Sequence, residues 1–283
     1  MQLIHTIAEL RASLASHDGI GFVPTMGNLH AGHIGLVEIA KQHAPTVVVS
    51  IFVNPLQFGA NEDFGKYPRT LQADCEKLQT AGADIVFAPS VEEIYPNFDG
   101  KNLNQTMSIT PPQLADTLCG ASRPGHFAGV ATVVMKLFNI VQPDVAIFGK
   151  KDFQQLLVIK ELVKQFNLPI EIIAAETTRE ADGLAMSSRN SYLSVEERKK
   201  AIELNQILQD ILQNISSGSR DFTGLRADAE NALRAKGWLV DYIAVRSAAD
   251  LAAPKPGDNH LVLLGAAKLG NTRLIDNFEI QLK

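Results

Sequence analysis

The segment that most constrains the fold of this chain is residues 25–33, which read Thr-Met-Gly-Asn-Leu-His-Ala-Gly-His. An apolar run at residues 20–23 leads into it, and a helical pattern of apolar residues follows over residues 34–40. The segment is therefore predicted to be a turn between a strand and a helix. Gly27 and Gly32 would let backbone N–H groups approach a bound group, and the unpaired donors of a helix start favour phosphate.

His30 and His33 are three residues apart, so both point the same way at a helix start. Two imidazoles there could donate hydrogen bonds to phosphate oxygens. A zinc pair is one alternative, but no Cys, His or acidic partner follows at ligand spacing. A solvated histidine is the other. The His-x-Gly-His pattern is short, so its value depends on the strand before it, the helix after it and its partners further along.

Strands and helices are predicted to alternate over the first part of the chain. The predicted strands are residues 46–53, 84–88, 107–109, 145–148 and 171–174, and the predicted helices are residues 6–15 and 70–81, one ending near 141 and one ending near 166. The strand at 46–53 is apolar and β-branched throughout, which is typical of a parallel strand buried on both faces.

The order of elements changes near residue 176. Ser194 and Glu197 form a capping box for a helix that runs to about residue 215. A helix at 223–236 and strands near 240–245, 261–266 and 272–279 follow, which is an α+β pattern. The sequence predicts two domains, residues 1–175 and 176–283.

Polar residues stand where an open α/β sheet binds its ligands, beyond the carboxyl ends of strands. Asn54 and Gln57 follow the strand at 46–53, although a loop Asn more commonly bonds its own backbone. Arg123 lies in the loop before the helix that ends near residue 141, where a cation fits an anionic substrate, although a loop Arg is usually solvated.

A second strand-to-helix turn, residues 149–152, carries Lys150 and Lys151. It lacks the spacing of a P-loop, and no Gly-x-Gly-x-x-Gly fingerprint is present, so the usual P-loop and NAD(P) sites are disfavoured. At the domain boundary, residues 187–189 read Ser-Ser-Arg, which could clamp phosphate. A helix-capping Ser in a solvated linker is the alternative.

Composition excludes several other classes of function. The formal net charge is −5, which does not suggest nucleic-acid binding, and no stretch approaches the roughly 20 apolar residues of a membrane span. The first ten residues lack the apolar core of a signal peptide. Cys75 and Cys119 form no close motif, so reduced thiols in a cytoplasm are expected.

Five segments, in this order, make the chain resemble the pantoate–β-alanine ligase family of HIGH-type nucleotidyltransferases. They are residues 25–33, residues 52–58 (Phe-Val-Asn-Pro-Leu-Gln-Phe), residues 123–127 (Arg-Pro-Gly-His-Phe), residues 149–155 (Gly-Lys-Lys-Asp-Phe-Gln-Gln) and residues 182–190 (Asp-Gly-Leu-Ala-Met-Ser-Ser-Arg-Asn). The resemblance covers essentially the whole length of the chain.

The resemblance implies an α/β fold, with a Rossmann-like parallel-sheet nucleotidyltransferase domain followed by a smaller α+β C-terminal lid domain, usually as a homodimer. It implies condensation of pantoate with β-alanine to pantothenate through a pantoyl-adenylate, dependent on ATP and Mg²⁺, with release of AMP and pyrophosphate. The ligands of the metal stay open.

The resemblance also implies roles for individual residues. His30 and His33 would hold the phosphates, with His33 as the expected proton donor. Lys151 would contact the α-phosphate, and Ser187, Ser188 and Arg189 would hold the outer phosphates. The implied ATP contacts are Met26, Gly27, Asn28, Leu29, His30, Ala31, Gly32, His33, Gly149, Lys150, Lys151, Asp152, Thr178, Met186, Ser187, Ser188 and Arg189. Gln57 and Gln155 would hold pantoate, with Asn54 and Arg123 as further candidates in the same pocket.

Two alternatives stay open. A different nucleotidyltransferase could share the histidine turn and use another acid, and a non-catalytic module could bind ATP without turnover. For the ligase, the acyl-adenylate must be kept from water. The loop at 187–189, and as a second candidate residues 55–69, are therefore expected to close over the site.

Overall fold

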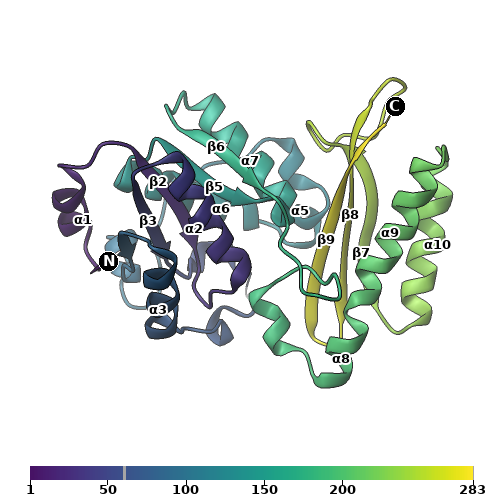
Figure 1. Cartoon of the computed structure of the whole chain (residues 1–283), viewed down its shortest axis with the longest axis horizontal. Helices are drawn as coiled ribbons and strands as arrows, with labels where there is room; N and C mark the ends of the chain where they lie inside the picture. Colours follow the sequence, from purple (N-terminus) through teal and green to yellow (C-terminus); the bar gives the residue numbers. More distant parts are fainter. Residues whose placement is uncertain (60–61, 283) are drawn as a thin grey trace.

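The computed structural model describes residues 1–59 and 62–282, and it divides into two parts that lie side by side (Figure 1). The first part is built on a six-stranded parallel sheet of order β1-β4-β3-β2-β5-β6. Its strands are β1 (Gln2–Ile4), β2 (Ile20–Thr25), β3 (Thr46–Ile51), β4 (Ile85–Phe87), β5 (Val145–Gly149) and β6 (Glu171–Ala175). This is the parallel α/β sheet that the alternating pattern predicts, and it is Rossmann-like, as the family resemblance implies.

Helices cover both faces of this sheet. They are α1 (Ile7–Leu14), α2 (Ala31–His43), α3 (Leu71–Ala81), α4 (Val91–Ile94), α5 (Cys119–Ser122), α6 (His126–Val141) and α7 (Phe153–Gln165). Val47 and Val49 of β3 pack in the core that includes α2 and α3, whereas Val48 packs in the opposite core with α1, α6 and α7. Because successive side chains of a strand point to opposite faces, a wholly apolar strand fits only this three-layer arrangement.

The order of strands determines where a ligand can bind. Strand β2 pairs with β3 on one side and with β5 on the other, so the chain leaves β2 and β5 in opposite directions. In an open parallel sheet, such a switch point leaves a crevice beyond the carboxyl ends of the two strands. The two turns that sequence analysis selected, residues 25–33 and 149–152, follow β2 and β5 and therefore meet at this crevice.

The second part is a three-stranded antiparallel sheet of order β7-β8-β9. Its elements are α8 (Val195–Lys200), α9 (Ile202–Ser216), α10 (Phe222–Ala235), β7 (Leu239–Ser247), β8 (His260–Leu269) and β9 (Thr272–Gln281). Helices α9 and α10 cover the face turned away from the first part (Figure 1). Leu208 and Leu233, with the indole of Trp238, are fully buried between these helices and the sheet.

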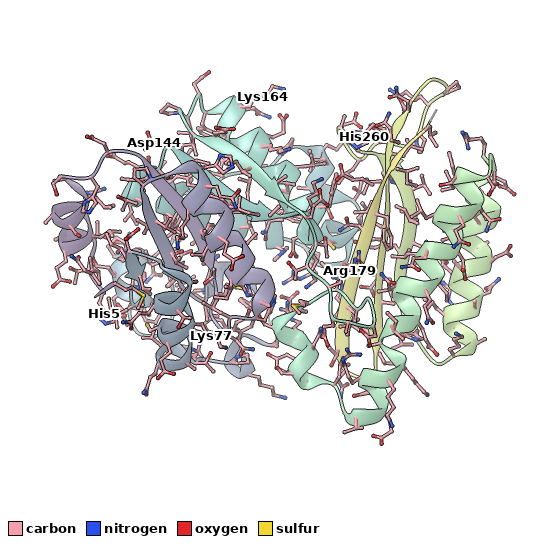
Figure 2. The ribbon with its side chains drawn as sticks, viewed as in Figure 1. His5, Lys77, Asp144, Lys164, Arg179 and His260 are labelled. Carbon is pink, nitrogen blue, oxygen red and sulfur yellow. The ribbon has the colours of Figure 1, made fainter. Side chains whose placement is uncertain are left out.

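The opposite face of the small sheet packs on the first part. Val262 and Leu264 of β8 contact Phe153 and Leu157 of α7 in one buried cluster. Arg179, on the segment that joins the two parts (Figure 2), donates two hydrogen bonds to the Asp276 carboxylate of β9, at 2.7 and 2.9 Å. The joining segment is therefore fastened to the second sheet.

The structure differs from the sequence prediction at four elements. Residues 107–109 are not a strand, and the Met107 side chain is 81% exposed. Strand β1 was not predicted; three residues at the edge of a sheet carry too short a pattern to detect. The helix expected to run to residue 215 breaks at Ala201 into α8 and α9. Strand β2 continues through Pro24 to Thr25.

No helix in the described part of the chain is both long enough and apolar enough to span a membrane.

Candidate active site

The turn after β2 is held by helix α3. Gly27 and Asn28 have φ angles of 83° and 51°, a left-handed backbone that is unfavourable for most residues but tolerated by Asn. The buried Asp74 carboxylate accepts the backbone N–H groups of Asn28 at 2.9 Å and Leu29 at 2.8 Å. The Lys77 ammonium donates to the Leu29 carbonyl at 2.7 Å. These two N–H groups are already bonded, so they are not the free phosphate donors that such a turn would offer.

The hydrogen bonds of His30 and His33 define the tautomers of both rings. The backbone N–H of Gly32 donates to His30 Nδ1 at 3.1 Å, and the backbone N–H of His30 donates to His33 Nδ1 at 3.3 Å. A backbone N–H can only donate, so both Nδ1 atoms are acceptors and each neutral ring carries its proton on Nε2. The ring centroids lie 4.1 Å apart, and both side chains line the cavity.

Both imidazoles are neutral near pH 7. Burial lowers the pKa of His30 to about 4, with a further contribution from the nearby charge of Lys151. Burial and the neighbouring His30 lower the pKa of His33 to about 3. The pair therefore presents two Nε2–H hydrogen-bond donors to the crevice and no positive charge.

The two lysines after β5 have different surroundings. The Lys150 ammonium forms ion pairs with Glu176 and with Glu279 of β9, and Lys150 is not among the residues that line the cavity. Lys151 faces the cavity, and within the described residues no carboxylate lies within ion-pair distance of its ammonium. Burial lowers the pKa of Lys151. A cation without a counterion beside two neutral donors is suited to an anionic ligand.

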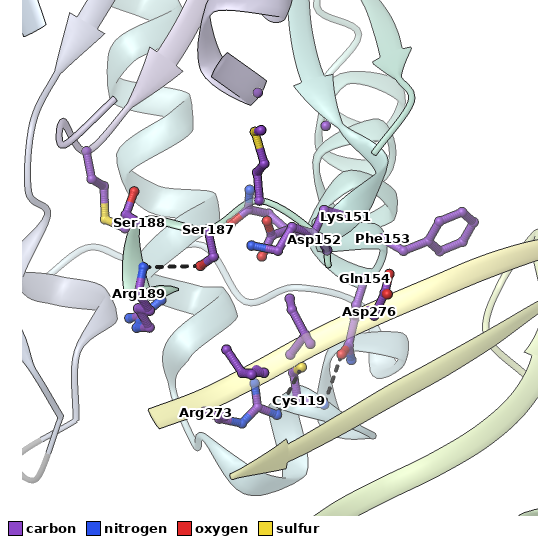
Figure 3. Close-up of a pocket in the computed structure, with 18 of the residues that line it drawn as sticks. Cys119, Lys151, Asp152, Phe153, Gln154, Ser187, Ser188, Arg189, Arg273 and Asp276 are labelled. Carbon is purple, nitrogen blue, oxygen red and sulfur yellow. Dashed lines mark hydrogen bonds between the residues drawn. The ribbon is translucent and has the colours of Figure 1, made fainter. Parts of the chain in front are cut away.

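Residues 187–189 reach the crevice from the other part of the molecule. Ser187 Oγ accepts the backbone N–H of Arg189 at 3.2 Å, which leaves its own hydroxyl hydrogen available. The Ser188 hydroxyl donates to the Asn28 carbonyl at 3.1 Å. The Arg189 guanidinium donates to both oxygens of Asp63, at 3.0 and 3.1 Å. Figure 3 shows Ser187, Ser188 and Lys151 around the same cavity.

One cavity of about 690 Å³ collects most of the predicted residues. The lining residues include Met26, His30, Gly32, His33, Asn54, Gln57, Arg123, Gly149, Lys151, Asp152, Gln155, Thr178, Met186, Ser187, Ser188 and Arg189. The five predicted residues that do not line it are Gly27, Asn28, Leu29, Ala31 and Lys150. Leu29 is a core residue, only 2% exposed, which explains its position facing away from the cavity.

The side-chain amide of Asn54 forms hydrogen bonds with other groups of the protein through both its nitrogen and its oxygen. Its amide Nδ2 donates to Gln57 Oε1 at 3.0 Å and to the Gly129 carbonyl at 3.2 Å. Its Oδ1 accepts the Tyr95 hydroxyl at 2.5 Å and a backbone N–H at 3.2 Å. The side chain is 1% exposed, and its bond to Gln57 Oε1 orients the Gln57 amide beside the cavity.

A chain of hydrogen bonds joins Gln57 to Arg123 through His126. The Gln57 carbonyl accepts from His126 Nδ1 at 2.9 Å, and His126 Nε2 accepts from Arg123 at 2.8 Å. Burial and the adjacent Arg123 charge lower the pKa of His126 to about 4, so the ring is a neutral connector. Arg123 also forms two hydrogen bonds with the Glu62 carboxylate, at 2.6 and 2.7 Å.

Sequence reasoning missed Asp74, Lys77 and the connecting role of His126. Asp74 stands in the first turn of α3, where an acidic residue is ordinarily explained by the helix dipole. His126 lies within the Arg-Pro-Gly-His-Phe segment at residues 123–127, but no single-residue signal distinguishes a connecting histidine from a solvated one. Both contacts join segments that are 45 residues or more apart, so only the fold reveals them.

Comparisons with known proteins agree over nearly the whole chain. The pattern of the pantoate-β-alanine ligase family matches residues 2–279. A pantothenate synthetase from Methylobacillus flagellatus is 60% identical over 282 residues, covering 100% of this chain and 99% of the relative. One from Neisseria meningitidis is 55% identical over 282 residues, covering 100% of each.

Solved structures agree with the sequence comparisons. The fold is similar to the crystal structure of pantothenate synthetase from Thermus thermophilus, with a TM-score of 0.92 at 44% identity, covering 99% of this chain and 100% of that one. It is also similar to a pantoate-β-alanine ligase from Francisella tularensis, solved with β-γ ATP and β-alanine, with a TM-score of 0.80 at 36% identity, covering 98% of this chain and 97% of that one.

Proposed function

The chain belongs to the pantoate–β-alanine ligase family, and from this premise we infer how its residues divide the work of the reaction. The enzyme condenses pantoate with β-alanine to pantothenate through a pantoyl-adenylate. Its pantoate carboxylate attacks the α-phosphorus of ATP, and the bond to the β-phosphate breaks to release pyrophosphate. The β-alanine amine then attacks the acyl carbon, AMP leaves, and the amine proton passes to solvent.

The observation that carries the assignment of roles is the shared cavity. His30, His33, Lys151 and Ser187 belong to three separate segments and all line it. One triphosphate could reach all of these donors. Negative charge builds on the phosphates as pyrophosphate leaves, and preorganised donors stabilise that charge most effectively in a buried site.

His33 acts in this proposal as a hydrogen-bond donor through Nε2–H. The resemblance implies a proton donor. Burial and the neighbouring His30 lower the pKa of His33 to about 3, so near neutral pH the ring carries one proton, on Nε2. The same Nε2–H group can stabilise the charge that develops on the phosphates by hydrogen bonding, without transferring its proton. His30 supplies a second donor of the same kind, and Lys151 supplies the positive charge at the α-phosphate.

The anionic substrates would replace internal carboxylates at two arginines. Glu62 bonds to Arg123, and Asp63 bonds to Arg189, and all four side chains line the cavity. Pantoate would take its place beside Gln57 and Gln155, with the Arg123 guanidinium nearby, and the outer phosphates of ATP would bind the Arg189 guanidinium. Glu62 and Asp63 belong to residues 55–69, the second segment expected to act as a lid. Residues 60–61 of that segment lie outside the described residues.

Mg²⁺ would arrive with ATP. Among the described residues no three His, Cys, Asp or Glu side chains are grouped so as to hold a metal ion. The residues present therefore fit a Mg²⁺ ion whose ligands would be mainly phosphate oxygens and water. The Asp152 carboxylate, which lines the cavity, could be a further ligand. When bound, Mg²⁺ neutralises phosphate charge.

Three further features are part of the same proposal. The chain would divide into two domains, residues 1–175 and 176–283, at the end of β6. The second domain would act as a lid over the cavity. A homodimer and a cytoplasmic location rest on the family resemblance. Cys75 and Cys119 are free thiols, which is compatible with a reducing compartment.

Isotope exchange between pyrophosphate and ATP tests the proposed order of steps. Exchange that requires pantoate and proceeds without β-alanine is expected, because the adenylate forms before the amine reacts. Exchange that occurs without pantoate, or only with β-alanine present, would contradict the proposal. Sedimentation of the purified protein would test the dimer separately.

A further inference from the structure

Alternate residues of strand β9 face the first domain. Arg273 reaches Cys119, Asn277 reaches the turn after β5, and Glu279 pairs with Lys150. The residues between them turn the other way, since Leu274 and Ile280 pack in the core with α9. One edge of the second domain therefore lies along the turn that carries Lys151 (Figure 3).

Asn277 uses both of its amide hydrogens on that turn. Its Nδ2 donates to the Lys150 carbonyl at 3.0 Å and to the Lys151 carbonyl at 2.9 Å. Two carbonyl acceptors can be satisfied only by the NH₂ end of the amide, so the network fixes the orientation of the side chain. Asn277 is 6% exposed, and its own backbone N–H donates to Asp276 at 2.8 Å.

The turn that Asn277 holds is otherwise held by the ion pairs of the Lys150 side chain with Glu176 and Glu279. It is the 3₁₀ turn η4 (Lys150–Asp152), and no side chain caps it. The Lys151 ammonium has no ion-pair partner among the described residues, so no protein carboxylate fixes its position. Where the ammonium lies therefore depends on how the backbone of residues 150–151 is held.

We propose that Asn277 is a positioning residue for adenylate formation, which acts by holding the Lys151 backbone so that the ammonium reaches the α-phosphate of ATP. The contact spans 126 residues and crosses the domain junction. The rate of the first chemical step therefore depends on how the second domain is seated on the first. The inference rests on the role proposed above for Lys151.

The first test measures pantoate-dependent pyrophosphate–ATP exchange in Asn277→Ala and Asn277→Asp. A displacement of about 1 Å in a catalytic group can cost about 100-fold in rate. We expect kcat to fall about 10- to 100-fold in Asn277→Ala, with the KM for ATP changed much less. Asn277→Asp should be worse, because its carboxylate faces two carbonyl oxygens and cannot donate. Asn277→Ser, which keeps one donor, should lie between Asn277→Ala and the parent.

Ile280→Ala is the matched control, because Ile280 lies on the same strand and faces the other way. It should lower the melting temperature at least as much as Asn277→Ala while leaving kcat for exchange near that of the parent. If the two variants lose kcat equally, Asn277 contributes only to stability and the inference is wrong. Should Asn277→Ala fail to fold, Asn277→Ser gives the same comparison.

A double-mutant cycle with Lys151→Ala decides whether Asn277 acts through Lys151. In that background, Asn277→Ala should have no further effect on kcat, because the group that it positions is gone. Independent losses that multiply would overturn the inference. A Lys151→Ala protein with unchanged exchange would instead refute the role proposed for Lys151, and the inference would fail with it for a recognisably different reason.

Discussion

Ser188 and Asn28, 160 positions apart in sequence, are joined by two hydrogen bonds. The Ser188 hydroxyl donates to the Asn28 carbonyl at 3.1 Å, and the Asn28 amide donates to the Ser188 carbonyl at 3.3 Å. Asn28 sits in the left-handed turn that leads to His30. Two residues beyond β6 are therefore bonded to the two turns of the crevice, Ser188 to one and Asn277 to the other.

This contact separates the expected roles of the two adjacent serines. Ser187 keeps a free hydroxyl hydrogen beside the cavity, whereas that of Ser188 is used on Asn28. We expect Ser187→Ala to raise the KM for ATP by about 10- to 100-fold, as for loss of one hydrogen bond to a charged group. Ser188→Ala should mainly lower kcat. Equal increases in KM for both variants, measured by initial-rate kinetics, would show that both hydroxyls bind ATP.

The tautomer of His33 predicts which substitute can replace it. Glutamine places an amide N–H near the position of Nε2, whereas asparagine places one near Nδ1. Because Nδ1 of His33 is an acceptor and Nε2 faces the cavity, His33→Gln should retain more exchange activity than His33→Asn. His33→Ala should lose about 10²- to 10³-fold in kcat. A glutamine variant as inactive as the alanine variant would favour proton transfer by His33 over hydrogen bonding.

The sequence predicted the layered α/β fold because its strongest signals are local. The apolar strand at residues 46–53 and the two strand-to-helix turns each reveal their structure within about ten residues. Strand order then brought residues 30 and 151 together. The sequence could not show that the Asp74 carboxylate accepts hydrogen bonds from the N–H groups of the turn after β2. Nor could it show that Lys151 lines the cavity and Lys150 does not. Both outcomes depend on partners distant in sequence, Asp74 for the turn and Glu279 for Lys150.

Acid should destabilise the protein through its buried neutral histidines. The pKa values of His30, His33 and His126 are lowered to about 4, 3 and 4, below the value near 6.5 of an unfolded histidine. Between pH 6.5 and 4 the unfolded chain therefore binds more protons, so the free energy of unfolding decreases as pH falls. Urea unfolding at pH 7 and pH 5 measures this. His126→Asn, which can keep the bond to the Gln57 carbonyl, should weaken the dependence; an unchanged dependence would show that His126 contributes nothing to it.

Asp74 tests whether the turn must be held from α3. In Asp74→Asn the amide can accept through only one oxygen, so the N–H group of either Asn28 or Leu29 loses its partner. A buried unpaired donor costs about 1–3 kcal/mol, so the melting temperature should fall by several degrees. The kcat/KM for ATP should also fall, because His30 follows this turn directly. Asp221→Asn is the control: an asparagine at that helix N-cap still accepts a hydrogen bond, and both quantities should stay near parent values.

Removing the charge of Asp63 is expected to raise the affinity for ATP, because Asp63 pairs with Arg189. Its carboxylate accepts two hydrogen bonds from the Arg189 guanidinium. Both side chains are partly exposed, Asp63 at 24% and Arg189 at 29%. ATP must displace this pair if its outer phosphates bind Arg189, and a pair of this kind contributes about 1 kcal/mol or less. Asp63→Asn should therefore lower the KM for ATP by up to about 5-fold. Asp228→Asn, on the exposed side of α10, removes the same charge far from the cavity and should leave KM unchanged. If Asp63→Asn instead raises the KM for ATP, the carboxylate orients Arg189 for the nucleotide and does not compete with it.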